Sequence, residues 1–366
     1  MKKNLLLLFA ALLSTIGTWA QDEDMLSTPL TLEAIEAGTV SFDNHAACPV
    51  TYRVNDGTAQ TIESETKGVI VLKADDKVAF FGDNYTNSGS NIDCSADCYI
   101  YGNIMSLVSS SNFATADKLE GSFYRLFGYN KHLKNHPTHK LMLPATKLAK
   151  SCYSFMFDNC TGLTEAPELP ATELAGGCYW SMFEGCTGLT KTPELPATTL
   201  ADGCYYDMFR GCSSLKKAPV LPATTLAERC YQGMFERCGE LTEVPMLPAT
   251  KLVDCCYNFM FSNCPNLNSV TCLATDISAA HSTSFFLTDG STTGTFYKHP
   301  DMKNWPAGIK GIPAGWKVVD YDMTGINAKT SDTKKTPATT YDLRGMKSAA
   351  GKKGLKIVGD KKIMTK

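Results

Sequence analysis

The chain has little net charge and few of the residues that build metal or catalytic sites. Acids and bases nearly balance, with a formal net charge of -2, and only 6 of its 366 residues are histidine. Such a balance gives no general attraction to nucleic acid or to an anionic membrane. No nucleophile–base pair and no pair of carboxylates stands outside the repeats described below. We therefore expect a non-enzymatic protein without a metal or another cofactor.

Long apolar runs are missing beyond the first twenty residues, so no later segment is predicted to span a membrane. The first twenty, MKKNLLLLFAALLSTIGTWA, combine Lys2 and Lys3 with an apolar run and a small residue at Ala20. This pattern predicts a secretory signal peptide over residues 1–20. An N-terminal membrane anchor is the alternative, disfavoured by the short apolar run. No cysteine follows Ala20 directly, so a lipoprotein anchor at that position is not supported.

The middle of the chain repeats one 26-residue unit five times. Each copy opens with LPAT, at Leu143, Leu169, Leu195, Leu221 and Leu247. Self-similarity at such a period is typical of stacked units that bury their apolar faces only against their neighbours.

Within the unit, apolar residues recur every four positions, as at Leu174, Cys178, Met182 and Cys186. That spacing places them on one face of a helix. A proline in each copy limits any strand to a few residues. The sequence thus predicts an α/β repeat solenoid, leucine-rich-repeat-like, with short parallel strands on one side and helices on the other.

The regions on either side of the repeats have a different pattern. Stretches such as PVTYRVN and VIVLKADDKVAFFG alternate with period two, which predicts an N-terminal all-β domain. Near the end of the chain, Gly359-Asp360 separates two apolar runs and predicts a hairpin in a small C-terminal β module. The predicted regions are a signal peptide over 1–20, the β-domain over 21–115, the solenoid over 116–294 (full repeats 143–272), a cap over 295–322, a linker over 323–340 and the C-terminal module over 341–366.

Fifteen cysteines in an exported chain would usually form disulfides. Each repeat places its two cysteines eight residues apart, as at Cys152 and Cys160, a rise of about 12 Å on a helix and too far for a bridge. Pairing between neighbouring repeats stays open, but buried thiols acting as small apolar groups are favoured. Cys94 and Cys98, outside the repeats, are the better candidates for a disulfide.

The repeats suggest a binding surface built from equivalent positions. The invariant tyrosine after the first cysteine of each copy is expected to stack inside the fold. The next position varies and carries Trp180 and Tyr206 on adjacent copies, which predicts an aromatic binding site. Partial burial of these two rings is the alternative. In another column Glu165, Lys191, Lys217 and Glu243 alternate in sign and predict ion pairs between repeats. His132, His136 and His139 could gather a metal ion, but solvated loop histidines are the favoured interpretation.

The repeat, with its Cys, Met-Phe and Cys followed by a Leu-rich turn and LPAT, resembles the BspA-like class of leucine-rich repeats of Bacteroides and related bacteria. The tail YDLRG…GLKIVGDKK is similar to C-terminal sorting-type modules of exported proteins from the same group. The resemblance implies an exported protein, secreted or on the cell surface at the outer membrane, with no catalytic residues. It implies protein binding or adhesion to a host, matrix or cell-surface protein. Carbohydrate binding is the alternative function.

Overall fold

The computed structural model describes residues 25–83, 89–115, 118–119, 123–323, 340–341, 347–348, 354–358 and 361–365. The predicted signal peptide and most of the predicted linker lie outside these residues.

The N-terminal region folds into two facing β-sheets. One sheet has the order β10-β8-β1-β6-β3-β4, and the other has the order β5-β2-β7. Phe42 of β2 meets Phe80 of β6 edge to face between the sheets, with ring centroids 5.5 Å apart. The strands are β1 (Thr31–Ala34), β2 (Gly38–Asn44), β3 (Val50–Val54), β4 (Gln60–Ile62), β5 (Thr66–Leu72), β6 (Lys77–Phe81), β7 (Asn91–Cys94), β8 (Cys98–Asn103) and β10 (Leu133–Asn135).

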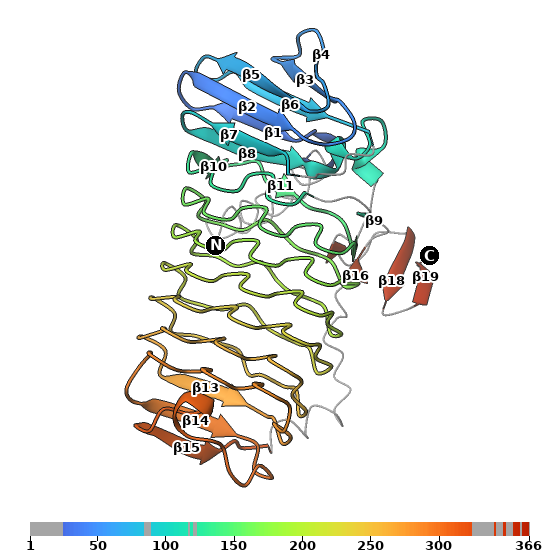
Figure 1. The fold of residues 1–366 in the computed structure, drawn as a ribbon. Coiled ribbons are helices and arrows are strands. Elements are labelled where there is room, and N and C mark those ends of the chain that lie inside the picture. The colour runs from blue at the N-terminus through green and yellow to red at the C-terminus, as the bar shows by residue number, and fades with distance from the viewer. Residues whose placement is uncertain are drawn as a thin grey trace, which may run out of the picture.

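The five repeats form a stack of coils below these sheets, one coil per repeat (Figure 1). Each coil has a segment of about ten residues that we call the turn arc. The turn arcs are residues 151–160, 177–186, 203–212, 229–238 and 255–264. Within a turn arc, backbone N–H groups alternate between two kinds of partner. Ser154 donates to Ser151 three residues back, whereas Phe155 donates to Trp180 in the next coil over 2.8 Å. The backbone N–H groups of the arc thus donate partly to carbonyls within its own tight turns and partly to carbonyls of the next coil.

The prediction of an α/β repeat solenoid is wrong, because the repeats contain no helix. In the described part of the chain, α-helix is confined to residues 25–27, and the other helical turns are short 3-10 helices. These are η1 (Ile104–Leu107), η2 (Phe113–Thr115) and η3 (Gly308–Lys310). The predicted strands of the unit are mostly reduced to single parallel bridges, such as Glu165 to Lys191 and Thr199 to Thr225.

The period of four has another cause than a helix. Every fourth residue of the turn arc has a positive φ, as at Gly203, Asp207 and Gly211. A chain in which three residues of right-handed backbone conformation are followed by one of left-handed conformation also directs every fourth side chain to the same side of the arc. The recurring glycines give the missed signal, since glycine adopts a positive φ without strain and weakens a helix interior.

The interior of the stack is filled by columns of identical side chains. The tyrosine column is buried, as predicted, and its rings stack between neighbouring coils; Tyr179 and Tyr205 lie 5.7 Å apart at 2°. The cysteines of the repeats are free thiols, nearly all buried. The second cysteine of each coil donates its thiol hydrogen to a phenylalanine carbonyl of the preceding coil, as from Cys212 to Phe183 over 3.1 Å. These cysteines fill the core as the sequence predicted.

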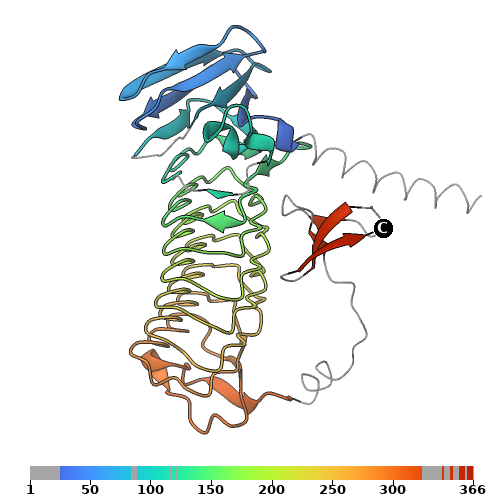
Figure 2. The same cartoon turned by 90° about the vertical axis from the view of Figure 1, so that its right-hand side faces the viewer.

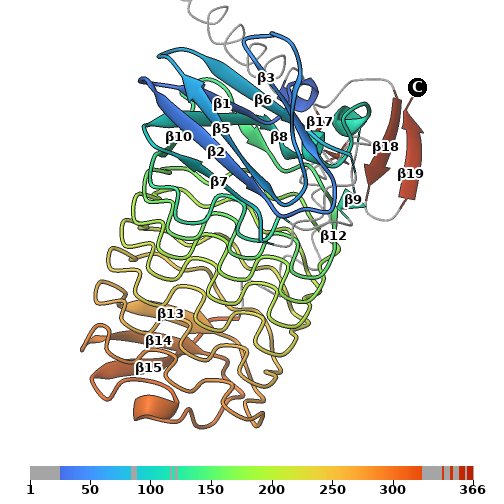
Figure 3. The same ribbon diagram turned by 45° about the horizontal axis from the view of Figure 1, so that its top comes forward.

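Sheets close both ends of the stack. At the N-terminal end, β10 and the short β11 (Leu141–Met142) pair in parallel with β8. Figure 3 shows this region lying over the first coils. At the other end β13 (Ser269–Cys272), β14 (Gly294–Lys298) and β15 (Trp316–Asp320) form a parallel sheet (Figure 2).

The remaining strands are short and lie outside these layers. Two-residue strands β9 and β12 pair in parallel. Strands β18 and β19 pair antiparallel, as the predicted hairpin requires, and Gly359-Asp360 lies outside the described residues. The remaining elements are β9 (Lys118–Leu119), β12 (Lys147–Leu148), β16 (Thr340–Tyr341), β17 (Lys347–Ser348), β18 (Gly354–Val358) and β19 (Lys361–Thr365).

Candidate functional site

The turn arcs place a row of aromatic rings on the outside of the stack. Trp180 and Tyr206 lie on adjacent coils with ring centroids 5.0 Å apart, and 41% of Trp180 is exposed. The structure therefore brings together the two residues that the sequence singled out. Tyr206 is only partly exposed.

Two rings that sequence reasoning missed extend this row. Phe155 lies 5.8 Å from Trp180, and Tyr124 lies 5.7 Å from Phe155. We call Tyr124, Phe155, Trp180 and Tyr206 the aromatic strip. Phe155 belongs to the neighbouring column of the repeat, so alignment of equivalent positions hid it. Its positive φ turns the side chain toward the ring of the next coil.

Amide groups continue the strip. Gln232 Nε2 donates a long hydrogen bond of 3.4 Å to the Tyr206 hydroxyl. Within the described residues, Gln232 Oε1 and Asn258 Oδ1 are both buried and have no hydrogen-bond partner. These acceptors follow Trp180 and Tyr206 in the same column of the repeat. The strip thus changes from aromatic to polar along the stack.

A group of ionised side chains lies on the same turn arcs. Arg210 Nη1 is 3.2 Å from Glu184 Oε1. Arg210 Nε is 3.2 Å from Glu236 Oε2, where the two groups form an ion pair but no hydrogen bond. Asp207 is farther away, with Oδ2 at 3.9 Å from the same guanidinium. We call Glu184, Asp207, Glu236 and Arg210 the carboxylate cluster. Three carboxylates share one guanidinium within it.

Asp207 has the longest ion-pair distance to Arg210 in the cluster and is as little exposed as Glu236. Only 13% of its side chain is exposed. Burial raises the pKa of Asp207 to about 7, opposed by the charge of Arg210 and helped by Glu184 and Glu236. Gly233 makes room for it, because a Cβ there would lie 1.8 Å from Asp207 Oδ1. Glu184, Arg210 and Glu236 occupy one column of the repeat, and their alternating charges are a signal that sequence reasoning missed; only Asp207 comes from another column.

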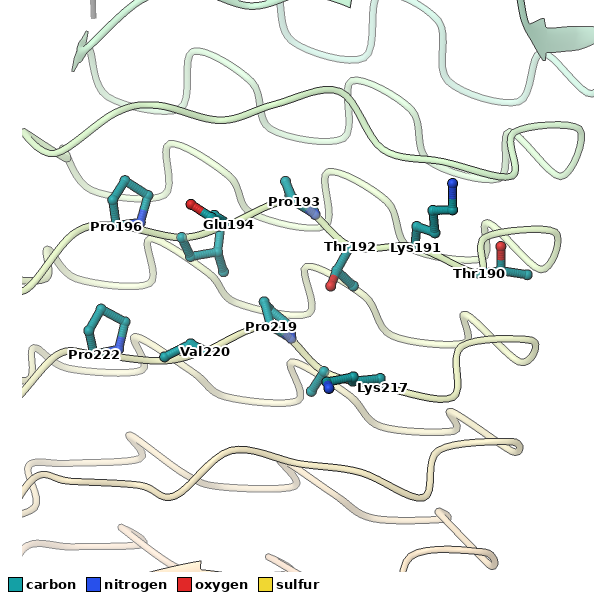
Figure 4. A pocket seen from close by; sticks show the side chains of 12 residues that line it. Thr190, Lys191, Thr192, Pro193, Glu194, Pro196, Lys217, Pro219, Val220 and Pro222 are labelled. Carbon is teal, nitrogen blue, oxygen red and sulfur yellow. The ribbon is translucent and has the colours of Figure 1, made fainter. Parts of the chain in front are cut away.

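A second surface feature is a shallow pocket of about 570 Å³ on two neighbouring coils (Figure 4). Its walls carry Pro193, Pro196, Pro219 and Pro222, together with the exposed Val220. Lys191 and Lys217 stand at one end of the pocket.

Both lysines are already paired. Lys191 binds Glu165 at 3.1 Å, and Lys217 binds Glu243 at 3.2 Å, which confirms the predicted ion pairs between repeats. These pairs neutralise both lysines, while the carboxylate of Glu194 also lines the pocket.

The predicted disulfide candidates are neighbours in space. Cys94 ends β7 and Cys98 begins β8, and both are buried free thiols. A hydrogen bond from Cys94 lowers the pKa of Cys98. The disulfide between them stays a prediction. No group of His, Cys, Asp or Glu in the described part of the chain could hold a metal ion, and this covers the predicted histidine group.

No protein-family model matches the chain, and neither a curated protein nor a solved structure shows significant similarity to it. The resemblance to the BspA-like class stays a prediction from the repeat residues. Among the described residues, no helix is long and apolar enough to span a membrane.

Proposed function

We propose that this chain is a non-enzymatic exported protein whose stack of coils mediates protein binding or adhesion, with the aromatic strip as the contact surface. The observation that carries the proposal is the run of four contacting rings, one from the segment before the repeats and three from successive coils. Exposed Trp and Tyr beside Arg are the residue types that dominate binding energy at protein interfaces. Export and a place at the cell surface or in the medium follow from the predicted signal peptide.

Carbohydrate binding is the second candidate. The unpartnered amide oxygen of Gln232, whose Nε2 donates to Tyr206, and that of Asn258 on the next coil favour it, because sugar hydroxyls pair well with amides beside an aromatic ring.

Binding should depend on the aromatic strip in either case. The chain from Gln21 onward is screened against immobilised extracellular-matrix proteins and against a glycan array. The double variant Trp180→Ala/Tyr206→Ala is expected to lose at least tenfold in affinity for the ligand found, since truncating a hot-spot aromatic costs about 2 kcal/mol or more.

The matched control for this variant is Val220→Ala. It removes an exposed apolar side chain from the proline-lined pocket of the same stack. Equal loss in the control and in the double variant, or no loss in either, would contradict the strip as contact surface. If the ligand found is a sugar and only the double variant loses it, carbohydrate binding is the supported function.

A further inference from the structure

The carboxylate cluster has more negative charge than its own cation neutralises. Arg210 makes its close contacts with Glu184 and Glu236, and Arg237 Nε lies 3.4 Å from the other oxygen of Glu236. In the described part of the chain, the nearest cation to Asp207 is Arg210 at 3.9 Å. The unneutralised charge is therefore concentrated at Asp207, next to Tyr206.

A buried hydroxyl without a partner lies beside this charge. Ser181 is 1% exposed, and its Oγ has no hydrogen-bond partner among the described residues. Ser181 and Asp207 are equivalent positions on adjacent coils, with φ of 49° and 51°. Their N–H groups donate to the next coil in the same way. The two side chains consequently leave the backbone in the same direction. Asp207 Oδ1 reaches the equivalent position of the next coil, Gly233, so the Ser181 hydroxyl is directed toward the coil that carries Asp207.

The aromatic strip borders the same place. Trp180 precedes Ser181 in the chain and Tyr206 precedes Asp207, and the charge of Asp207 adds to burial in raising the pKa of Tyr206. A cation near a Trp or Tyr face is attracted by the ring, more strongly when water is excluded. The protein has such a contact elsewhere, with Arg125 Cζ 4.6 Å from the ring centroid of Tyr129. Rings, carboxylates and a spare acceptor all suit a cation with N–H donors.

We propose that Trp180, Tyr206 and Asp207, with Glu184 alongside, recognise a basic side chain, lysine ammonium or arginine guanidinium, presented by a partner protein. This inference rests on the proposed function and narrows its partner to a protein with a basic contact segment. A basic group supplies the positive charge that Asp207 lacks and donates to the Ser181 hydroxyl. A neutral donor supplies no positive charge, and an acidic ligand is repelled by the carboxylates.

Binding should then respond to pH through Asp207. Its carboxyl is surrounded by Arg210, Glu184, Glu236 and Tyr206. Because a cation binds the ionised form, affinity should rise as pH increases from 6 to 8. Added salt should weaken it by screening.

The test measures the binding of octalysine, octaarginine, octaglutamate and neutral dextran to the chain from Gln21 onward by isothermal titration calorimetry. The expected result is saturable binding of one or both basic peptides and none of the other two. Asp207→Asn, which keeps the shape and removes the charge, should weaken that binding at least tenfold. Glu243→Gln, an equally simple charge removal on the proline face, should leave it unchanged. Thermal melts of each variant verify that it is folded.

Several outcomes would overturn the inference. They are no saturable binding of either basic peptide up to millimolar concentration, equal binding by wild type and Asp207→Asn, or tighter binding of dextran. A partner protein can also lose affinity for Trp180→Ala/Tyr206→Ala and keep it for Asp207→Asn. This result would contradict the inference of a basic contact but not the proposed function. The two ideas can thus fail separately.

Discussion

Asp207 shows how a single side chain can link stability to recognition. Burial removes most of the water from its carboxyl, and the Arg210 guanidinium is 3.9 Å away. A buried carboxylate without a close partner is destabilising in its charged form. A protein that keeps such a group on its outer face bears a cost in folding stability that a ligand can offset.

Replacing Asp207 by asparagine should stabilise the protein, and more so at high pH. The unfolded carboxyl ionises near pH 3.9, whereas the folded one keeps its proton up to about pH 7. Between these values the unfolded state releases a proton first, so the wild type loses stability as pH rises, and above pH 7 the loss is complete. This loss lowers the free energy of unfolding of the wild type by on the order of 2 to 4 kcal/mol. The asparagine variant does not have it.

Urea unfolding of the wild type and of Asp207→Asn at pH 4 and pH 8 measures this difference. The gain from Asp207→Asn should be clearly larger at pH 8. A gain that is equal at the two pH values, or a loss that grows with pH, would contradict the raised pKa. Lys217→Gln, an exposed charge on another column, should show no pH-dependent gain.

Among the elements, the turn arc depends on residues that tolerate a positive φ. Gly203 has a φ of +57° and open space around its missing side chain, with Tyr206 Cβ as the nearest atom at 3.9 Å. Only backbone conformation, not a clash, therefore opposes a side chain there. Gly239 lies in the same stack without a positive φ and has similar free space.

We expect Gly203→Ala to destabilise the protein by about 1 to 2 kcal/mol, the cost of a left-handed residue with a Cβ. Gly239→Ala should be close to neutral. Urea denaturation of the two variants distinguishes the turn arc from a helix, since alanine would stabilise a helix by about 1 kcal/mol. A stabilised Gly203→Ala variant would refute the positive φ.

The sequence predicts some elements well and others poorly, for physical reasons. Alternation with period two identifies the strands that hold Tyr52 and Phe80, because a strand has no competitor with that period. A period of four does have a competitor: the chain of turns buries Cys178, Met182 and Cys186 as a helix would. The stacking of the tyrosines follows from their repetition. The contact between Phe155 and Trp180 does not, because it joins different columns of the repeat.

At the scale of the whole molecule, the stack ends in parallel strands that need a cover. β14 hydrogen-bonds to β13 on one side and to β15 on the other. Phe296 of β14 and Trp316 of β15 are buried there. Without β14 and β15, the last coil would lose the cover of Phe296 and Trp316 and expose both the edge of β13 and apolar surface, which invites association with other chains.

A chain that ends at Thr293 lacks β14 and β15 and should associate at micromolar concentration. A chain that ends at Met323 keeps both strands and is the matched control. Size-exclusion chromatography with light scattering compares the two. A monomeric shorter chain with an unchanged melting temperature would mean that the last sheet does not protect the stack.

The hydrogen bonds between coils also bear on how this protein can change over evolutionary time. Every second donor in a turn arc reaches a residue about one repeat length further on, and the same rule holds in every coil. An in-frame duplication or loss of one whole unit would leave the terminal sheets and the remaining pairings intact. The stack would then grow or shrink by one coil, about the 5.7 Å between stacked tyrosine rings. Related genes could thus encode binding surfaces of graded length from a single repeating unit.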